Sequence, residues 1–275
     1  MRFFNYLQNN LIANYRGRFA PSPTGELHFG SLIALLGSYL TAKKNQGVWL
    51  IRIEDIDSTR CKKIYSEKIL KLISAYGLVS DEKIRIQSEH LDDYEQALKL
   101  LEKQLYYCHC NRKERNFCLC SKKNYSEGVL RLRLENQEIN FNDELLGFKS
   151  YELKNYPDPI LKRKNGDFAY LLASLVDDEI QGISDVVRGS DLLELTPLQI
   201  FIQKKLRIKT PNYLHLPLAL DEKGRKLSKQ NHATALKIEN ASLDFLKALE
   251  FLGFTITEKD LKRNPQELLK EVLKL

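Results

Sequence analysis

The sequence has few of the features that stabilise extracellular proteins or anchor proteins in membranes. Only five of its 275 residues are cysteines, and four of these lie between positions 108 and 120, which is a poor disulfide framework for this chain length. No stretch approaches the roughly 20 consecutive apolar residues that cross a bilayer. Residues 1–16 are interrupted by Asn and Gln and lack the apolar core of a signal peptide. We therefore expect reduced thiols, no membrane partner and a cytoplasmic protein.

Acidic residues are fewer than basic ones, 36 against 43, which gives a formal net charge of +7. An excess of positive charge favours a polyanionic partner such as nucleic acid and predicts salt-sensitive binding. An ordinary basic surface gives the same net charge, so both interpretations stay open at this point. The cations are scattered in small groups without a long basic tail. An RNA partner would therefore bind to a folded surface, and we expect the chain itself to be a monomer.

Strand and helix patterns alternate along much of the chain. Apolar residues recur with helical spacing from Leu32 to Leu40, and residues 47–53 (GVWLIRI) have the composition of a buried strand. Residues 15–20 (YRGRFA) supply a strand before them. Strand, turn, helix and parallel strand form a βαβ unit, so we expect an α/β fold with a Rossmann-like parallel sheet. Residues 106–161 interrupt this alternation with cysteines, charges and short strand-like runs.

The turn before the first predicted helix, PSPTGELHFGS from Pro21, is rich in proline and glycine and contains His28. A glycine-containing turn that enters a helix leaves backbone N–H groups at the positive end of the helix dipole, which favours anions. Gly25 and Gly30 permit close approach of a ligand because they lack a Cβ. A second loop, DEKGRKLSKQN, groups four cations around one glycine. Taken alone, the first loop could be no more than a tight turn, and the second no more than a charged surface loop.

Taken together, RFAPSPTGELHFGS, RIEDID and KLSKQ resemble the catalytic core of class I glutamyl-tRNA synthetases. In that family two motifs bind ATP and stabilise the adenylation transition state, and residues 28–31 (HFGS) and 226–230 (KLSKQ) correspond to them. Phe29, Ser31 and Gln230 depart from the residues that name the motifs. The resemblance runs from about Arg16 to about His232. It implies activation of L-glutamate with Mg²⁺-bound ATP, without a covalent enzyme nucleophile.

The resemblance also implies a role for individual residues. Cationic and polar groups hold the substrate carboxylates, and Glu54 holds the α-ammonium group. Asp55 and Asp57 are expected only to orient neighbouring loops. The implied catalytic residues are His28, Lys226 and Lys229, the ATP-binding residues are His28, Gly30, Ser31 and Lys229, and the glutamate-binding residues are Arg18, Phe19, Ala20, Pro21, Ser22, Glu54, Tyr170 and Arg188.

Five segments are predicted on this basis. They are an N-terminal extension (1–15), the first half of the Rossmann-like catalytic domain (16–105), an inserted small α+β subdomain with the cysteines (106–161), the second half of the catalytic domain with the KLSKQ loop (162–232) and a C-terminal helical segment (233–275). The extension is either an additional helix or partly disordered.

The segment after the KLSKQ loop is too short for the anticodon-binding domain of a glutamyl-tRNA synthetase. The chain therefore resembles the truncated paralogues of that family, the glutamyl-Q tRNA(Asp) synthetases, which transfer glutamate to queuosine in the anticodon of tRNA(Asp). The vicinal diol of queuosine is similar to the terminal diol of a tRNA, so one active site could esterify either. A compact synthetase that charges an ordinary tRNA 3′ end and a non-catalytic RNA-binding paralogue remain the alternatives.

The cysteines form a C-x-C-x7-C-x-C pattern at Cys108, Cys110, Cys118 and Cys120. Four thiolates this close can surround a tetrahedral Zn²⁺ ion, although paired C-x-x-C units are the more usual signature. The resemblance adds that members of the family often carry zinc in this insertion, held by three cysteines and a tyrosine. Cys118 would here supply the remaining ligand. We predict one structural zinc ion, and the alternative is a reduced cysteine-rich loop.

Overall fold

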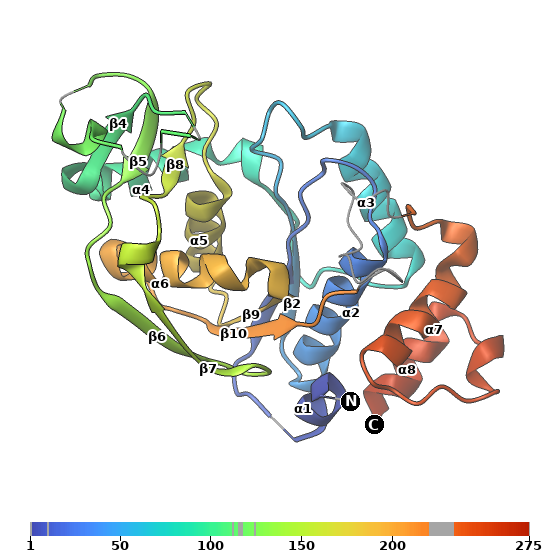
Figure 1. Cartoon of the computed structure of the whole chain (residues 1–275). Helices are drawn as coiled ribbons and strands as arrows, with labels where there is room; N and C mark the ends of the chain where they lie inside the picture. Colours follow the sequence, from blue (N-terminus) through green and yellow to red (C-terminus); the bar gives the residue numbers. More distant parts are fainter. Residues whose placement is uncertain are drawn as a thin grey trace.

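The predicted βαβ unit is present in the computed structural model, which describes residues 2–9, 11–111, 113–114, 118–123, 125–219 and 234–274 (Figure 1). Its parts are β1 (Arg16–Phe19), α2 (Phe29–Lys44) and β2 (Val48–Ile53), and β1 pairs with β2 in parallel. β3 (Arg85–Ile86) continues the parallel sheet on the other side of β2. β2 is buried along nearly its whole length, which explains why it consists of large apolar residues around a single arginine.

A second parallel pair, β9 (Asp185–Gly189) and β10 (Asn212–Leu216), is connected through α6 (Thr196–Leu206). It meets the first sheet where Ser184 N donates to Arg16 O at 3.0 Å and Arg16 N donates to Ser184 Oγ at 2.8 Å. These contacts bring β1 and β9 side by side. The chain crosses from one half of the sheet to the other at this point, and in open α/β sheets ligands bind outside the carboxyl ends of such strands.

Helices cover both faces of this sheet, as the alternation of patterns predicted. One apolar core joins α2 to α1 (Arg2–Asn9), α3 (Lys63–Ala75), α7 (Ala241–Phe251) and α8 (Pro265–Lys274). The second core joins α4 (Leu91–Leu100), α5 (Tyr170–Ile180) and α6. The short 3₁₀ helices are η1 (Gln87–Glu89), η2 (Glu102–Gln104), η4 (Cys120–Lys122), η5 (Leu153–Asn155), η6 (Ser190–Leu195), η8 (Ile238–Asn240) and η9 (Asp260–Lys262).

Local sequence signals explain where several helices begin and end. α3 is followed by Gly77 at φ +76°, a left-handed position that favours glycine after a helix. Pro197 lies in the first turn of α6, where its missing N–H costs no hydrogen bond. The first residues form the helix α1, in agreement with the first of the two alternatives for this segment. None of the helices described is long and apolar enough to cross a membrane.

The residues between the two halves of the sheet form two separate structures. β4 (Leu105–Cys108), β5 (Val129–Leu132) and β8 (Ile160–Lys162) make a small antiparallel sheet, at the opposite end of the molecule from α7 and α8 (Figure 1). The hairpin of β6 (Glu138–Asp143) and β7 (Gly147–Glu152) instead pairs with β10 and so extends the β9–β10 sheet. This pairing places Asp143, at the end of β6, opposite Tyr213 of β10.

Candidate active site

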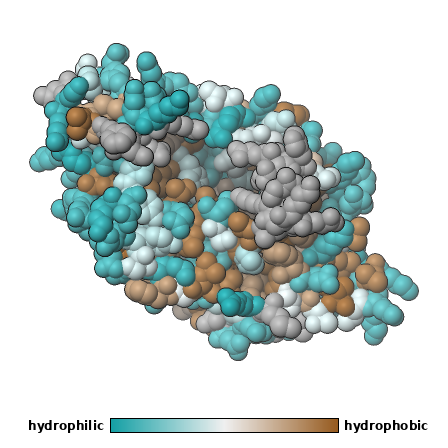
Figure 2. Space-filling view, viewed as in Figure 1, coloured by the Kyte–Doolittle hydropathy of each residue, from teal (hydrophilic) through white to brown (hydrophobic). Residues whose placement is uncertain are grey.

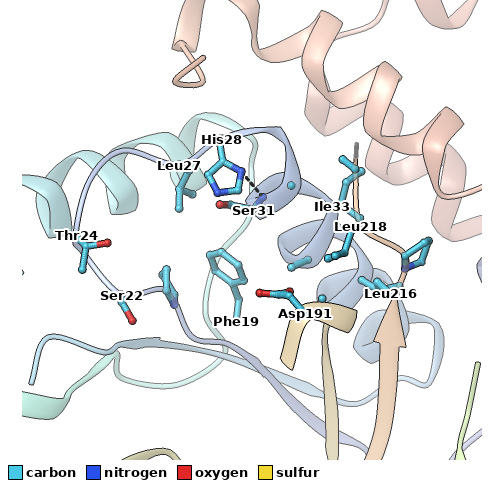
Figure 3. A pocket seen from close by; sticks show the side chains of 16 residues that line it. Phe19, Ser22, Thr24, Leu27, His28, Ser31, Ile33, Asp191, Leu216 and Leu218 are labelled. Atoms are coloured by element: carbon cyan, nitrogen blue, oxygen red, sulfur yellow. Dashed lines mark hydrogen bonds between the residues drawn. The ribbon is translucent and has the colours of Figure 1, made fainter. Parts of the chain in front are cut away.

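A cavity of about 370 Å³ lies at the carboxyl ends of β1, β9 and β10 and at the start of α2 (Figure 3). The turn that the sequence singled out forms one wall of it, and the segment after β10 forms another. Of the predicted site residues, Phe19, Pro21, Ser22, His28, Gly30 and Ser31 line the cavity; the other lining residues are Thr24, Leu27, Ile33, Ala34, Gly189, Asp191, Leu216, Pro217, Leu218 and Ala219.

His28 is the N-cap residue of α2. Its Nδ1 accepts a hydrogen bond from Ser31 N at 3.4 Å, which partly satisfies one of the N–H groups at the helix start (Figure 3). In the neutral ring the proton therefore lies on Nε2. His28 also pairs through its backbone with Ala235, and Leu236 N donates to Leu27 O at 2.9 Å. The segment before α7 is thus hydrogen-bonded directly to the turn that contains His28.

Arg188, on β9, is 5% exposed and its guanidinium group is held by neutral acceptors. Its Nη2 donates to Thr196 Oγ1 at 2.9 Å and to Gln199 Oε1 at 2.6 Å, and its Nη1 donates to the Tyr170 hydroxyl at 3.5 Å. Its Nε donates to His215 Nε2 at 3.0 Å. The two predicted glutamate-binding residues Tyr170 and Arg188 therefore lie in contact.

His215 connects Arg188 to Asp143. The His215 ring is fully buried, and its Nδ1 lies 2.6 Å from Asp143 Oδ2. Burial lowers the pKa of His215 and outweighs the opposing effect of Asp143, so the ring is neutral at pH 7. A neutral ring that donates from Nδ1 to the carboxylate has an unprotonated Nε2, which is the acceptor that Arg188 requires. The β6–β10 pairing thus fixes the orientation of an arginine on β9.

Arg18 lies in a network of buried charges. Its Nε donates to Asp178 Oδ1 at 2.9 Å, and Arg52 Nη1 donates to the same oxygen at 2.8 Å. Arg52 Nη2 also donates to Glu54 Oε1 at 3.0 Å. These four residues are at most 5% exposed. Asp178 thus orients two arginines at once, and one of them also holds the predicted ammonium-binding residue Glu54.

Two carboxyl groups of this network have shifted pKa values of opposite sign. Burial raises the pKa of Glu54 to about 7, although Arg52 and Arg18 oppose the shift. Burial also disfavours the charged form of Asp178, but Arg18 and Arg52 outweigh it and lower the pKa of that group. Asp178 is therefore ionised at pH 7, whereas Glu54 is divided between its two forms.

The predicted residues form two adjacent groups. Arg18 and Arg188 do not line the cavity, but the residues that follow them, Phe19 and Gly189, do. Burial raises the pKa of Tyr213 to about 12, and the charges of Arg188, Arg18 and Asp178 also affect this pKa. The Tyr213 ring lies 5.2 Å from the Arg188 guanidinium group. Arg18 and Arg188 are carried by β1 and β9, which lie side by side in the sheet.

The remaining predicted residues have simpler positions. Ala20 connects β1 to the turn, and Glu54 N donates to Pro21 O at 3.0 Å, which ties the end of β2 to the same turn. Asp55 accepts hydrogen bonds from Ser88, and Asp57 accepts hydrogen bonds from Thr59, Arg60 and Arg163. The predicted catalytic residues Lys226 and Lys229 lie outside the residues that the structure describes.

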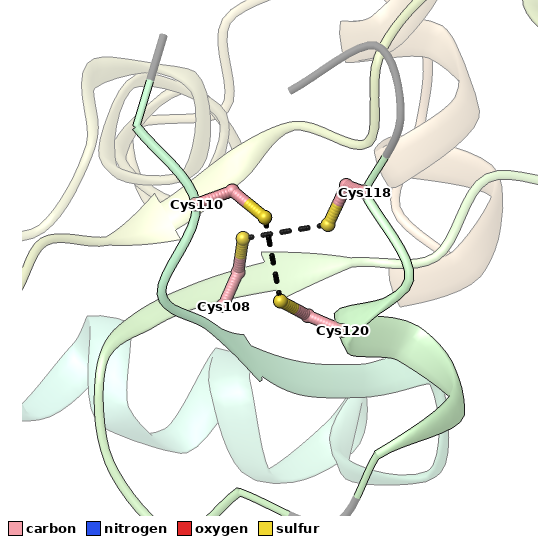
Figure 4. Close-up of side chains that lie close together, drawn as sticks. All are labelled: Cys108, Cys110, Cys118 and Cys120. Carbon is pink, nitrogen blue, oxygen red and sulfur yellow. Dashed lines mark hydrogen bonds between the residues drawn. The ribbon is translucent and has the colours of Figure 1, made fainter. Parts of the chain in front are cut away.

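The four clustered cysteines converge on one point. Their sulfur atoms all lie within 4.8 Å of one another, with Cys108 3.6 Å from Cys118 and Cys110 3.5 Å from Cys120 (Figure 4). Four thiolates bound tetrahedrally at about 2.3 Å from a metal are about 3.8 Å apart, so the arrangement fits such an ion. Burial opposes ionisation of Cys120, but hydrogen bonds from the His109 backbone and the other thiols lower its pKa to about 7.

The sequence and the fold both match proteins of one family. The family model of class I tRNA synthetases (E and Q), catalytic domain, matches residues 14–117 and 119–268. A glutamyl-Q tRNA(Asp) synthetase from Vibrio parahaemolyticus is 45% identical over 94% of this chain and 91% of its own length. This chain belongs to the family of class I tRNA synthetases (E and Q). The Escherichia coli (strain K12) relative of the same name is 44% identical over 87% of this chain and 81% of its own length.

Solved structures support the fold of this family member. A glutamate tRNA ligase from Elizabethkingia meningosepticum, in complex with its amino acid, aligns with a TM-score of 0.75. The alignment covers 95% of the present chain and 66% of that ligase, at 24% identity. Glutamate-tRNA synthetase from Elizabethkingia anophelis gives the same values. This similarity establishes the α/β fold with its Rossmann-like sheet.

Proposed function

We propose that this chain activates L-glutamate with ATP and transfers it to queuosine in the anticodon of tRNA(Asp). The observation that carries the proposal is the identity of 41–45% to glutamyl-Q tRNA(Asp) synthetases along about nine-tenths of the chain. In the first step an α-carboxylate oxygen of glutamate attacks the α-phosphorus of ATP, and the bond to the leaving pyrophosphate breaks. In the second step a hydroxyl of the queuosine diol attacks the activated carbonyl, and AMP leaves.

Glutamate binds, in this proposal, to the group around Arg188. The Arg188 guanidinium, with Tyr170 at 3.5 Å, receives the side-chain carboxylate. Arg18 with the backbone of Ala20, Pro21 and Ser22 contributes to the same site. Charge-assisted hydrogen bonds from a guanidinium group to a carboxylate are strong and directional, and they strengthen when the groups are buried. Glu54 in its ionised form holds the α-ammonium group.

ATP, as its Mg²⁺ complex, occupies the cavity at the start of α2. The start of a 16-residue helix presents backbone N–H groups, including that of Gly30, to phosphate oxygens, and Ser31, whose N–H donates to His28, lines the same cavity. His28 donates to the nucleotide from Nε2, the nitrogen that carries the proton once Nδ1 caps the helix. Lys226 and Lys229 stabilise the charge that develops on the leaving pyrophosphate. Positioning and electrostatics thus carry the reaction.

The remaining segments support this core. Residues 16–105 and 162–232 belong to the catalytic domain and residues 106–161 to the insertion, whose β6–β7 hairpin extends the β9–β10 sheet. The flanking helices α1, α7 and α8 pack against α2. The metal at the cysteine cluster is one Zn²⁺ ion, because four thiolates are the donor set of structural zinc sites. Four protein ligands leave no position open for substrate, so the role of this ion is structural. The chain acts as a monomer.

The experiment that tests the proposal measures incorporation of labelled glutamate into tRNA(Asp) with and without queuosine, beside tRNA(Glu). Labelling that requires both ATP and queuosine is the expected result. Labelling of tRNA(Glu) instead would favour a compact synthetase that charges the 3′ end. A failure to exchange pyrophosphate into ATP in the presence of glutamate, with or without tRNA, would favour a non-catalytic RNA-binding paralogue.

A further inference from the structure

Two of the three nitrogens of the Arg188 guanidinium group are fully hydrogen-bonded. Nε donates to His215 Nε2 at 3.0 Å, and Nη2 donates to Thr196 Oγ1 at 2.9 Å and to Gln199 Oε1 at 2.6 Å. Among the described residues, Nη1 has only the Tyr170 hydroxyl, at 3.5 Å. The guanidinium group is a planar fork of five N–H donors, so bonds to two of its nitrogens fix the direction of the third. Nη1 is therefore the nitrogen that is left for a substrate oxygen.

Gln199 is the closest of these acceptors, and it is neutral. It lies on α6 and is 1% exposed. Its Nε2 donates to Ser174 Oγ at 3.3 Å, which turns its side-chain oxygen toward Arg188. The carboxylate of a glutamate residue has nearly the same shape and would bind a guanidinium group more strongly. It would also pair with the charge, whereas the amide holds the arginine and leaves its charge uncompensated.

His215 is a second neutral acceptor, and Asp143 determines which of its nitrogens accepts. Burial opposes ionisation of Asp143, but hydrogen bonds from His215 and from the backbone N–H groups of Leu146 and Leu145 lower its pKa. The ionised carboxylate requires the proton of the neutral ring on Nδ1, 2.6 Å away. Nε2 is then free of a proton and accepts from Arg188. The imidazole ring thus keeps the Asp143 carboxylate out of contact with the arginine.

The surroundings of Arg188 strengthen the effect of its charge. Arg188, Thr196, Gln199 and His215 are each at most 5% exposed. On the face that Figure 2 shows, apolar residues gather near the middle of the molecule, in the region where Figure 1 places α6 and β10, whereas hydrophilic side chains cover much of the insertion. Charges interact more strongly where water is excluded. A carboxylate that reaches Nη1 consequently gains more than it would at an exposed arginine.

We propose that Gln199 and His215 are positioning residues of the glutamate site, which direct Nη1 of Arg188 at the substrate carboxylate and leave the charge of this arginine for the substrate. Both residues act through Arg188, and Asp143 acts through His215. The preference for glutamate over glutamine then depends on acceptors that are neutral by construction. The inference rests on the proposed function, which supplies the substrate.

The first test replaces Gln199 with two side chains of similar size. Gln199→Glu adds a negative charge beside Arg188, and Gln199→Met removes the acceptor without adding a charge. We expect Gln199→Glu to raise the Michaelis constant for glutamate in pyrophosphate exchange about tenfold or more and to reduce the preference for glutamate over glutamine by a similar factor. Its melting temperature should stay equal or rise, because the new carboxylate pairs with Arg188.

Gln199→Met should show the opposite pattern. Its melting temperature should fall, because a buried N–H group of Arg188 loses its acceptor. The Michaelis constant for glutamate should rise by only about threefold and the preference over glutamine should persist, since the charge of Arg188 is untouched. Stability and glutamate affinity therefore change in opposite directions between the two variants, which a purely structural role of Gln199 does not produce.

The second test compares His215→Gln with His215→Leu. Both variants lose the hydrogen bond to Asp143 and should melt below the parent protein. Glutamine places a neutral oxygen near the position of Nε2, so the Michaelis constant for glutamate should stay within about threefold of the parent value, whereas leucine offers no acceptor and should raise it about tenfold or more. The Michaelis constant for ATP should be unchanged in all four variants, because neither Gln199 nor His215 lines the cavity at α2.

An unchanged preference for glutamate in Gln199→Glu would overturn the proposal, as would equal Michaelis constants for glutamate in His215→Gln and His215→Leu. Calorimetric titration with L-glutamate separates this proposal from the proposed reaction. If the parent protein binds glutamate without exchanging pyrophosphate, and Gln199→Glu weakens this binding more than Gln199→Met does, the reaction is wrong and the positioning role stands. If the parent protein exchanges pyrophosphate and both Gln199 variants match it, the positioning role is wrong and the reaction stands.

Discussion

Asp178→Asn is expected to destabilise the protein strongly while it preserves the shape of the side chain. The Asp178 carboxylate lies between Arg18 and Arg52, at 2.9 and 2.8 Å from their nitrogens, and the three groups are 5%, 4% and 0% exposed. Asparagine offers one acceptor oxygen and no charge. Arg52 keeps Glu54 and Asp177 as neighbours, but Arg18 has no other ion-pair partner among the described residues.

The magnitude follows from the loss of one member of a buried pair, which typically costs about 3–5 kcal/mol. Because only Arg18 is left without a counter-ion, we expect the lower end, about 3 kcal/mol of the free energy of unfolding at pH 7. The pKa of Asp178 is lowered in the folded state, so its contribution is present above the ordinary aspartate pKa of about 3.9. The contribution is lost as the pH falls below that value, and the variant and the parent should then converge.

Urea unfolding followed by circular dichroism measures this difference, and Glu258→Gln, which neutralises an exposed carboxylate, is the matched control. The control should change the free energy of unfolding by no more than about 0.5 kcal/mol. The Michaelis constant for glutamate in pyrophosphate exchange should rise in Asp178→Asn, because Arg18 loses its orientation. A loss of stability below about 1 kcal/mol, or one equal to that of the control, would refute the reasoning.

Four further predictions concern the proposed chemistry. Arg188→Ala should weaken the apparent affinity for glutamate about tenfold or more; an unaltered Michaelis constant in pyrophosphate exchange would contradict the assignment. Lys229→Ala should slow adenylation about 10²-fold or more, and an unchanged single-turnover rate would remove this residue from the mechanism. Metal analysis should find one equivalent of zinc, lost in Cys118→Ser together with thermal stability; purified protein without metal would leave only a cysteine-rich loop. Because the pKa of Glu54 is raised to about 7, glutamate binding should strengthen as the pH rises from 6 to 8; the same pH profile in Glu54→Gln would exclude this group.

The sequence predicted the scaffold well because the signals that carry it are local. The alternation of strand and helix patterns, Gly77 after α3 and the composition of β2 each depend on a few neighbouring residues. The cysteine spacing likewise brings four thiols together across one short loop, and the structure confirms their convergence. Motifs at the ends of successive strands lie at one edge of the sheet for the same topological reason.

The supporting residues of the site were missed, because they come from distant parts of the chain. Asp143 reaches His215 only through the parallel pairing of β6 with β10, which no local pattern encodes. Asp178 did carry a signal. It follows Leu171 and Leu175 at helical spacing, on the face of α5 that is buried, and a carboxylate on an apolar face requires a cationic partner. The sequence does not state that this partner is Arg18.

The two arginines of the proposed glutamate site differ in the charge that surrounds them, and this difference bears on substrate choice. Arg18 is neutralised by Asp178, whereas every hydrogen-bond acceptor that the described residues offer to Arg188 is neutral. His215, one of these acceptors, is hydrogen-bonded in turn to the carboxylate of Asp143. The neutral His215 ring therefore lies between that carboxylate and Arg188. No ion pair of Arg188 is found among the described residues.

The charge of Arg188 favours a substrate whose side chain is ionised. A glutamate carboxylate supplies the missing negative charge, whereas the amide of glutamine leaves the guanidinium unpaired and presents N–H groups to other donors. Discrimination against glutamine then arises mainly from the cost of an unpaired buried cation, and the hydrogen bonds that glutamate itself forms contribute less. Arg188→Gln should consequently reduce the preference for glutamate over glutamine in pyrophosphate exchange by a larger factor than Arg18→Gln does. Equal losses of preference in the two variants would mean that Asp178 does not neutralise Arg18 as the distances indicate.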